Sequence, residues 1–386
     1  MKRKLLTVED YRLLAKRKLP RVAFDNIDGA DESELTMREN AAVFDQVALR
    51  PRNGTRVGVP ELATMLFGTT LSMPVILAPC GMARVVHPHG DIAGARAAAA
   101  VGTAFALSMM SGHAMEDVAA AASGPLWFQV YNFGGLDRTA RAIDRAAKAG
   151  FQALVITLDT QVSPARLRDV RNGASTLLGN TSLRQLPYTP QLFRHPVWLA
   201  RRLRDGLVPR VPNVILDDGS PGYLWKDGRP SSLTWGDFSW IREHWPGPVI
   251  AKGVLTAADA NRAVECGVDA VVVSNHGGRQ LDGTEPTLRA LPEVVAAVGG
   301  RCAVLMDGGI RRGNDVIKAM SLGASAVMIG RPWLFALGAG GQAAIEELLE
   351  KFRADLVRDL QLMGYARPSD LDAGAVRAPA HWFTAR

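Results

Sequence analysis

A histidine and an arginine stand three residues apart in one glycine-rich segment of the chain. Residues 274–282 read SNHGGRQLD and contain His276 and Arg279. An imidazole takes a hydroxyl proton near neutral pH, and a guanidinium group binds a carboxylate through two parallel hydrogen bonds. The adjacent glycines let the backbone approach a ligand closely. Taken alone, His276 fits a structural histidine equally well, but its place after an apolar run, beside an arginine, favours a base.

A second pair of charged residues follows another apolar run. Asp159 ends this run, and Arg166 lies seven residues later. A carboxylate beside His276 would stabilise the imidazolium that forms once the proton arrives, and a second arginine would help to hold an anionic substrate. The alternative is an ordinary surface pair of Asp and Arg, which contributes little.

Lys252 is nearly the only charge in its apolar run, residues 249–255. Burying a lysine without an anionic partner is costly, so a negative group should lie beside it. A reduced flavin, with charge near its N1 atom, would be such a group. The alternative is a rim lysine whose ammonium group reaches water.

Two further segments combine glycine with arginine. They read DGGIRRG at residues 307–313 and IGR at residues 329–331. Backbone amides in such turns, together with arginines, hold a phosphate group after strands seven and eight of (β/α)₈ barrels. The position of these two segments, after the last two expected strands, is what indicates a phosphate site, because two adjacent glycines alone indicate only a turn.

Eight short apolar runs alternate with helical segments along the chain. Most are continuously apolar, as strands buried on both faces of a parallel sheet are. Gly150, Gly267 and Gly323 follow expected helices, which a left-handed glycine ends at little cost. We therefore expect an α/β fold, a (β/α)₈ TIM barrel with the polar residues at the carboxyl ends of its strands; an open doubly wound sheet is the competing fold. The expected strands are Val75–Ala78, Thr103–Leu107, Trp127–Tyr131, Leu154–Asp159, Val249–Lys252, Ala270–Ser274, Val304–Asp307 and Ala326–Ile329.

Two regions fall outside this repeat, although we expect residues 1–386 to form a single domain. In the N-terminal segment, Val8–Arg17 and Glu32–Phe44 are expected to be helices that pack beneath or beside the barrel. After the fourth strand, residues 173–232 are too long for an ordinary connection and are interpreted as an insertion. Its arginines alternate with apolar side chains, which suits either an active-site lid or a surface that contacts an anionic membrane.

The composition indicates a globular protein. Of 386 residues, 47% are hydrophobic and 22% are charged, which supplies a large core and gives no sign of disorder. A net charge of +7 suits an anionic substrate or membrane but is modest for this length, so no nucleic-acid partner is expected. Three scattered cysteines predict neither disulfides nor a metal site. With no secretory signal, we expect a cytoplasmic protein, with peripheral contact at the inner face of the membrane if the insertion binds lipid.

These residues together resemble the family of FMN-dependent 2-hydroxy-acid dehydrogenases and oxidases, which includes glycolate oxidase, L-lactate dehydrogenase and mandelate dehydrogenase. The likeness covers nearly the whole chain, and residues 274–282 are its most specific part. Further matching motifs are LP at 19–20, EN at 39–40, SMP at 72–74, WFQVY at 127–131 and IGRP at 329–332.

The resemblance implies that the chain binds FMN and oxidises a 2-hydroxy acid to the 2-oxo acid, with hydride transfer to flavin N5. It implies that His276 is the base, with Asp159 as its partner. It also implies that Tyr131 donates a hydrogen bond to the substrate. Arg166 and Arg279 would hold the substrate carboxylate. The residues that it implies for FMN binding are Ala78, Ser108, Gln129, Thr157, Lys252, Ser274, Asp307, Gly309, Arg311, Gly330 and Arg331.

The sequence departs from the family pattern on the substrate side. Asn26 stands where the family usually has a carboxylate-binding tyrosine, and its amide is a shorter hydrogen-bond donor. Met110 occupies a substrate-pocket position that is aromatic or small in many members. Gln161 and Pro164 replace the customary Pro and Gly before the arginine. These departures bear on substrate identity more than on flavin binding.

Three hypotheses follow from this reading. The first is an FMN-dependent 2-hydroxy-acid dehydrogenase or oxidase, homo-oligomeric as its relatives commonly are, that passes electrons to oxygen or a quinone. The second is a biosynthetic tailoring flavin oxidase acting on a larger or peptide-derived substrate, as Asn26 and Met110 suggest. The third is a flavin-binding scaffold or membrane-docked regulatory protein without turnover, which the presence of His276 and Arg279 disfavours.

Overall fold

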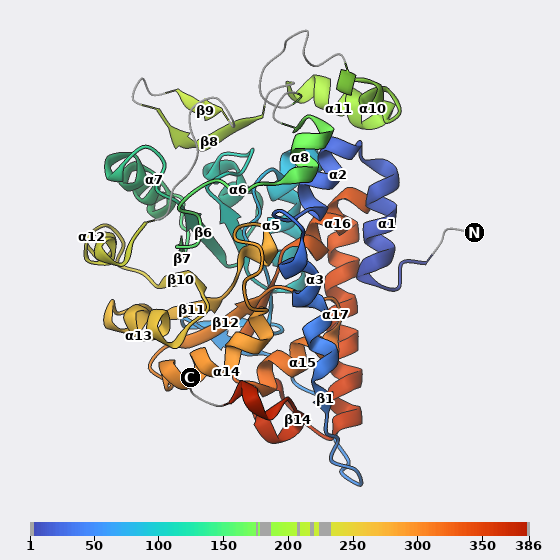
Figure 1. Cartoon of the computed structure of the whole chain (residues 1–386), viewed down its shortest axis with the longest axis vertical. Coiled ribbons are helices and arrows are strands. Elements are labelled where there is room, and N and C mark those ends of the chain that lie inside the picture. Colours follow the sequence, from blue (N-terminus) through green and yellow to red (C-terminus); the bar gives the residue numbers. More distant parts are fainter. Residues whose placement is uncertain are drawn as a thin grey trace.

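Eight parallel strands close into a barrel at the centre of the molecule (Figure 1). The computed structural model describes residues 4–174, 177, 187–206, 209–216, 220–223 and 233–383. Around the barrel the strands follow the order of the chain, which confirms the predicted TIM barrel and excludes the open sheet. The strands are β4 (Val75–Leu77), β5 (Phe105–Ser108), β6 (Leu126–Val130), β7 (Ala153–Thr157), β10 (Val249–Val254), β11 (Ala270–Val273), β12 (Ala303–Asp307) and β13 (Ala326–Ile329).

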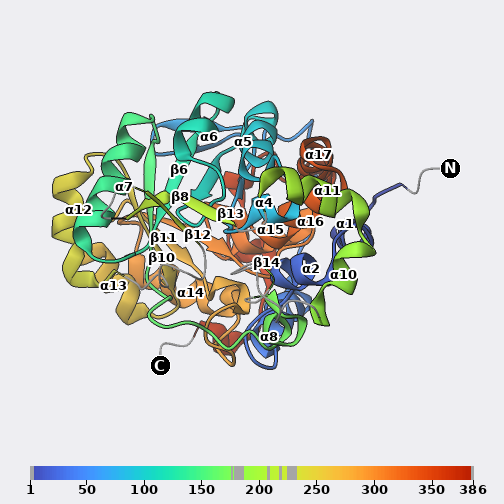
Figure 2. The same cartoon turned by 90° about the horizontal axis from the view of Figure 1, so that it is seen from above.

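Helices surround the barrel, as Figure 2 shows from above. The three glycines expected to end helices all adopt left-handed backbone, with φ of 83° at Gly150, 68° at Gly267 and 102° at Gly323. The helices that follow the strands are α4 (Ala83–Val86), α5 (Gly90–Val101), α6 (Met115–Ala121), α7 (Leu136–Lys148), α8 (Leu167–Asn172), α12 (Phe238–His244), α13 (Ala257–Glu265), α14 (Thr287–Val298), α15 (Gly313–Ser321), α16 (Arg331–Gly340) and α17 (Gln342–Met363).

A small hairpin packs against the apolar interior of the barrel. It consists of β2 (Thr64–Leu66) and β3 (Thr69–Leu71), which the sequence analysis did not predict. Its turn residue Phe67 lies against Trp127, with ring centroids 5.6 Å apart. Because the hairpin immediately precedes β4, it covers the end of the barrel opposite the carboxyl ends of the strands. Another short pair, β1 (Ala48–Leu49) with β14 (Val376–Arg377), joins the N-terminal segment to the C-terminal part of the chain.

The N-terminal segment lies beside the barrel, where α1 (Val8–Lys18) packs on α16. A second helix, α2 (Arg21–Asp28), was not predicted. Residues 22–28 of this helix are all buried, including Asp25, Asn26 and Asp28, and the burial of these polar residues depends on partners outside the helix. Figure 1 shows α2 between α1 and α8.

The predicted start of the helix Glu32–Phe44 is wrong. The structure has α3 (Leu35–Ala42) followed by a short 3₁₀ turn. Glu34 is in the left-handed region with φ of 61°, so it cannot belong to the helix. The amides of Leu35 and Thr36 instead donate to the carboxylate of Asp282, at 3.2 and 2.9 Å. This acceptor is remote in the sequence, so the helix start is not encoded locally.

The insertion forms structure of its own above the barrel rim. Its described parts contain α10 (Pro190–Phe193), α11 (Pro196–Asp205), β8 (Arg210–Ile215) and β9 (Pro221–Tyr223). Trp198 donates its indole N–H to the carbonyl of Val85 at 2.8 Å, and the amide of Met115 donates to Asn213 at 2.8 Å. The insertion is therefore fixed to the segments that follow β4 and β5.

An asparagine pair ties α3 to the loop after β11. Asn40, which is 1% exposed, exchanges two hydrogen bonds with Asn275, at 2.8 and 2.9 Å. It also accepts the amide hydrogen of Thr287 at 3.1 Å. The segment that carries His276 is thus held from outside the barrel by a buried polar group.

We predict that Asn40→Ala lowers the free energy of unfolding by about 3 kcal/mol, because buried partners in Asn275 and Thr287 lose their hydrogen bonds. Urea unfolding of the FMN-loaded protein measures this change. The exposed Asn53→Ala is the matched control and should shift the value by less than about 0.5 kcal/mol. Equal effects of the two substitutions would contradict the anchoring role.

Candidate functional site

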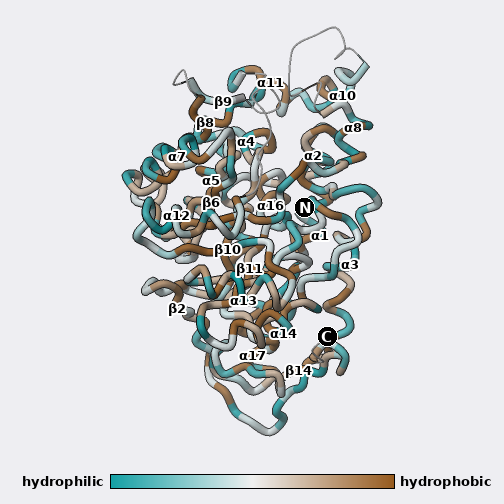
Figure 3. Tube along the Cα trace, turned by 60° about the vertical axis from the view of Figure 1, so that its left-hand side comes forward, coloured by the Kyte–Doolittle hydropathy of each residue, from teal (hydrophilic) through white to brown (hydrophobic). Residues whose placement is uncertain are grey.

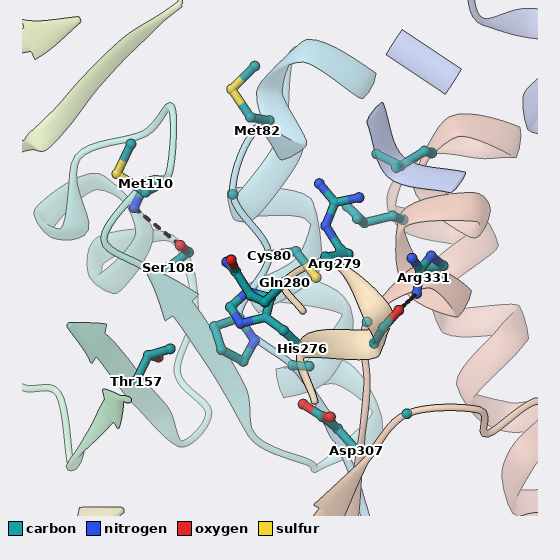
Figure 4. A pocket seen from close by; sticks show the side chains of 18 of the residues that line it. Cys80, Met82, Ser108, Met110, Thr157, His276, Arg279, Gln280, Asp307 and Arg331 are labelled. Atoms are coloured by element: carbon teal, nitrogen blue, oxygen red, sulfur yellow. Dashed lines mark hydrogen bonds between the residues drawn. The ribbon is translucent and has the colours of Figure 1, made fainter. Parts of the chain in front are cut away.

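A cavity of about 340 Å³ opens at the carboxyl ends of the barrel strands. Figure 4 shows side chains from several of these strand ends around one space. Two predicted site residues, Asp159 and Ser274, do not line it and lie behind residues that do. The predicted residues that line it are Asn26, Ala78, Ser108, Met110, Gln129, Tyr131, Thr157, Arg166, Lys252, His276, Arg279, Asp307, Gly309, Arg311, Gly330 and Arg331.

His276 and Asp159 form a hydrogen-bonded pair. The Nδ1 atom of His276 lies 2.9 Å from Oδ1 of Asp159, which leaves Nε2 for the cavity. The backbone of His276 has φ of 57°, an uncommon conformation for a residue with a side chain. Gly253 makes room for Asp159, because a Cβ atom there would lie 3.0 Å from the Asp159 side chain. Loop and strand together fix the direction of the imidazole.

Burial and the carboxylate act on His276 in opposite directions. Burial lowers the pKa of His276 below its ordinary value of 6.5, and the charge of Asp159 offsets part of this effect. The imidazole is therefore neutral at pH 7 and able to accept a proton. Burial alone would raise the pKa of Asp159, but His276, the charge of Lys252 and a backbone hydrogen bond together more than compensate, so the pKa falls and Asp159 remains a carboxylate.

Two guanidinium groups reach the same cavity. Arg279 donates from Nη1 to the carbonyls of Asn26 at 2.6 Å and Gly29 at 2.9 Å. The buried Nε atom of Arg166 has no hydrogen-bond partner in the described part of the chain. Burial and the like charge of Arg279 lower the pKa of Arg166 to about 9, so the guanidinium group of Arg166 stays charged at pH 7. This arrangement calls for a bound anion.

The other predicted substrate-side residues line the cavity near these arginines. Asn26, 5% exposed, has its amide 3.4 Å from the carboxylate of Asp169. Met110 is 9% exposed, and its amide donates to Ser108 Oγ at 3.1 Å. Burial and then Asp159 raise the pKa of Tyr131 to about 12, so its hydroxyl keeps its proton and can donate it in a hydrogen bond.

A row of polar side chains crosses the ends of β5, β6 and β7. Ser108 Oγ donates to the Gln129 carbonyl oxygen at 3.1 Å, and the Gln129 amide donates to Thr157 Oγ1 at 2.9 Å. Each of the three is at most 3% exposed. This chain of hydrogen bonds fixes which polar atoms of the cavity wall are donors and which are acceptors.

Lys252 has the negative partner that the sequence analysis required. Its ammonium group lies 2.9 Å from Oδ2 of Asp307 and also donates to Ser274 Oγ at 2.8 Å. Ser274 is fully buried behind the lysine. The negative partner of Lys252 is thus a protein carboxylate, whereas a reduced flavin was expected from the sequence. The second carboxylate oxygen of Asp307 is buried without a hydrogen-bond partner among the described residues.

The end of the cavity beyond Asp307 suits an anion. The first residues of α16 line this end of the cavity, so the amides at the start of that helix and the charge of Arg331 both face the same part of the cavity. Arg331 donates to the carbonyls of Gly277 and Gly29, each at 2.7 Å, while its buried Nε atom finds no partner in the residues that the structure describes. Gly309 permits the tight turn here, since a Cβ atom would lie 1.7 Å from the Asn40 carbonyl oxygen.

These features fit FMN. Cationic groups and helix-terminal amides suit its phosphate, the orphaned oxygen of Asp307 suits a hydroxyl donor of its ribityl chain, and the buried polar row and Lys252 suit its ring. Every FMN residue implied by the sequence resemblance lines the cavity except Ser274, which orients Lys252 from behind.

Sequence reasoning missed several lining residues. Pro79–Met82 follow β4 directly, and the rule that chemistry gathers after barrel strands would have included them. Asp169 lies three residues after Arg166, about one helical turn, and lines the cavity as Arg166 does. Val162 and Val170 line the mouth with 79% and 70% of their side chains exposed, and they carry no sequence signal.

Neither a metal site nor a membrane span emerges from the described ranges. No group of three or more His, Cys, Asp or Glu side chains there is arranged to hold a metal ion. No helix in those ranges has both the length and the apolar character to cross a bilayer.

Comparison with known proteins agrees with this geometry. Residues 15–378 match the family described as FMN-dependent dehydrogenase. An L-lactate dehydrogenase of Xanthomonas axonopodis pv. citri (strain 306) is 41% identical over 374 residues, which cover 95% of each chain. An L-lactate dehydrogenase of Pseudomonas putida (strain GB-1) is 41% identical over 369 residues, covering 94% of this chain and 95% of that one.

Solved structures give the same result. The crystal structure of the monotopic membrane protein (S)-mandelate dehydrogenase superimposes with a TM-score of 0.89 and 32% identity, covering 98% of this chain and 100% of that one. A mandelate oxidase variant with (S)-mandelic acid gives a TM-score of 0.81 at 33% identity, over 97% and 98% of the two chains. With a family match over nearly its whole length and relatives of this identity, the chain belongs to the FMN-dependent dehydrogenase family.

Proposed function

We propose that this chain, an FMN-dependent enzyme that oxidises 2-hydroxy acids to 2-oxo acids, uses His276 as its base and Arg166 with Arg279 as its carboxylate clamp. One observation carries the proposal. Two guanidinium groups without an ion-pair partner in the described chain share a cavity with a neutral, carboxylate-oriented imidazole. The carboxylate of a 2-hydroxy acid can pair with the two guanidinium groups, and its hydroxyl can give a proton to the imidazole.

In this mechanism each protein group acts at a stated atom. The substrate carboxylate accepts hydrogen bonds from Arg166 and Arg279, and the hydroxyl of Tyr131 donates to a substrate oxygen. The substrate hydroxyl then gives its proton to Nε2 of His276. Asp159, already at Nδ1, stabilises the imidazolium that results.

FMN, when bound, supplies the acceptor at N5 for the hydride equivalent that leaves the substrate Cα. Lys252 and the polar row would lie along its ring, and Asp307 along its ribityl chain. Gly309, Arg311, Gly330 and Arg331 would hold its phosphate. In this proposal residues 1–386 form one FMN-dependent barrel domain, and residues 173–232 are its inserted surface.

The substrate class rests on the relatives and on the cavity. Relatives at 41% identity are L-lactate dehydrogenases, so L-lactate is the first substrate to test. Asn26 and Met110 would shape the space beyond the reacting carbon. The second candidate, a tailoring oxidase for a larger substrate, draws support from Val162 and Val170, which leave exposed apolar surface at the mouth of the cavity.

We also propose that the insertion contacts a membrane surface. Phe193, Val197 and Leu203 on α10 and α11 are 71%, 65% and 58% exposed, and arginines stand between them. Figure 3 shows that these helices lie at one end of the molecule. A solved relative is a monotopic membrane protein, which supports this contact. A quinone, which such contact brings close, is the electron acceptor that we propose over oxygen.

His276→Ala should keep bound FMN but lose its reduction by L-lactate. Removing a general base costs about a thousandfold in rate. Anaerobic bleaching of the flavin absorbance measures this step directly. His244→Ala on α12 is the matched control and should bleach at the wild-type rate. If His276→Ala bleaches as fast as the control, the assignment of the base fails. Bleaching of the wild type by long 2-hydroxy acids but by no small one would favour the tailoring oxidase.

Asp159→Asn should lower both the rate and the pH at which the rate declines. Wild-type kcat/KM falls as the pH drops through the pKa of His276, which lies below 6.5. Without the Asp159 charge this pKa falls further, so the decline moves to lower pH. The plateau also drops about a hundredfold, because the imidazolium loses its partner. A pH profile of kcat/KM with L-lactate tests this. Asp117→Asn, an exposed control, should leave the profile unchanged, and a midpoint that rises in Asp159→Asn would contradict the pairing.

Phe193→Ser with Val197→Ser should weaken binding to phospholipid vesicles about tenfold, since two exposed apolar side chains no longer enter the lipid. Co-sedimentation with vesicles measures the binding. Val59→Ser with Met65→Ser removes equally exposed apolar side chains, 78% and 70%, near the opposite end of the barrel. Loss of binding in this control alone would place the contact there and overturn the proposal.

A further inference from the structure

A second cavity, of about 500 Å³, lies between the insertion and the body of the molecule. Its walls come from residues 17–19 at the end of α1, 84–88 in and after α4, 194–205 in and around α11, and 337–341 at the end of α16. Figure 2 shows α11 beside α4, α16 and α1. Among the described residues, none lines both this cavity and the FMN cavity. We call it the basic cavity.

The basic cavity carries far more positive than negative charge. Asp205 is the single carboxylate among its described lining residues, and it already lies 3.3 Å from Arg84. Such an excess of one sign in a partly enclosed space attracts an oppositely charged ligand. The cationic side chains that line it are Arg17, Lys18, Arg84, Arg194, Arg201 and Arg202.

One of these cations is held inside the wall of the cavity. Arg202 is only 6% exposed, and burial lowers its pKa to about 10, an effect that the nearby charge of Asp205 opposes. Asp205 also pairs with Arg84, so this one carboxylate acts on two guanidinium groups of the wall. A bound anion would add negative charge to this part of the cavity.

Neutral donors add to this charge. Burial and the charge of Arg201 lower the pKa of His87 to about 4, so its ring is neutral at pH 7. Nδ1 of His87 accepts the amide hydrogen of His89 at 3.3 Å, which puts the ring proton on Nε2. The N-terminus of the ten-residue helix α11 also lies on the cavity, and the side chain of His195 at its N-cap makes no capping hydrogen bond. Pro196, the first residue of α11, has no N–H, so the amides of Val197 and Trp198 are the first-turn donors at this end of the cavity.

We infer that the basic cavity binds a phosphate group, carried by a phospholipid headgroup or by a soluble phosphate compound. Arginines match phosphate oxygens through paired hydrogen bonds, and several cations together suit a group with more than one negative oxygen. Val197, which is exposed, lines the cavity on α11, so a lipid whose head enters the cavity would meet an apolar side chain there.

This inference does not depend on the proposed catalytic roles or on membrane contact, because a soluble phosphate compound can fill the cavity in either case. Its test uses the FMN-loaded protein, in which the flavin phosphate site is already occupied. Arg194→Gln with Arg201→Gln removes two exposed cations of the basic cavity. Arg171→Gln with Arg204→Gln is the control, with the same loss of charge at exposed positions that do not line it. Retention of bound FMN and an unchanged urea unfolding midpoint verify that both variants are folded.

Two binding measurements separate the sources of phosphate. Calorimetric titration with inorganic phosphate at constant ionic strength reports a soluble ligand. Co-sedimentation with phosphatidylglycerol vesicles, compared with phosphatidylcholine vesicles, reports an anionic headgroup. We expect the cavity variant to weaken at least one of these interactions tenfold or more and the control to change it less than twofold.

Each outcome decides the question. Weakened binding of inorganic phosphate alone assigns the cavity to a soluble phosphate compound, and weakened binding of anionic vesicles alone assigns it to a headgroup. Loss of both means that the cavity accepts either. If the cavity variant and the control differ in neither measurement, positive charge in general explains any binding and the basic cavity is not a phosphate site.

Discussion

Two like charges held in one buried cavity are the constraint on which this site depends. Arg166 and Arg279 repel each other, and burial and this repulsion together lower the pKa of Arg166. The protein meets this cost partly with backbone carbonyls. Arg279 donates to the carbonyls of Asn26 and Gly29, which belong to the last turn of α2 and its cap, the negative end of a helix dipole. A bound anion would offset the rest of this cost.

The same helix end serves the phosphate region. The carbonyl of Gly29 also accepts from Arg331, so one residue of the N-terminal segment joins the two cationic ends of the FMN cavity. In turn, α2 is held by buried charge. Asp28 accepts from Arg12 at 2.5 Å and from Arg168 at 2.8 Å, and these arginines lower its pKa against the opposing effect of burial. The N-terminal segment is thus part of the site and not an appendage of the barrel.

Much of the barrel and of the site could be predicted from the sequence, because buried parallel strands leave a continuous apolar signal and their carboxyl ends meet at one rim. His276, Lys252 and Asp307 follow from that rule. The sequence did not reveal α2, the hairpin β2–β3, the start of α3 or the partner of Lys252. Each of these depends on a contact with a residue remote in the chain, such as Asp282 with Thr36 or Phe67 with Trp127. Local patterns do not encode such contacts.

The insertion belongs to the same network. Gln191 of α10 accepts the amide hydrogen of Val22 in the first turn of α2 at 2.7 Å and donates to the carbonyl of Asn172 at the end of α8 at 3.1 Å. It therefore bridges the helix whose other end holds Arg279 and the helix that follows Arg166. One insertion side chain thus fixes the spacing of the two elements that bring the guanidinium groups together. The surface that we propose to meet the membrane is therefore joined, through Gln191, to α2 and α8, which contribute Asn26 and Asp169 to the cavity that we propose to bind the substrate.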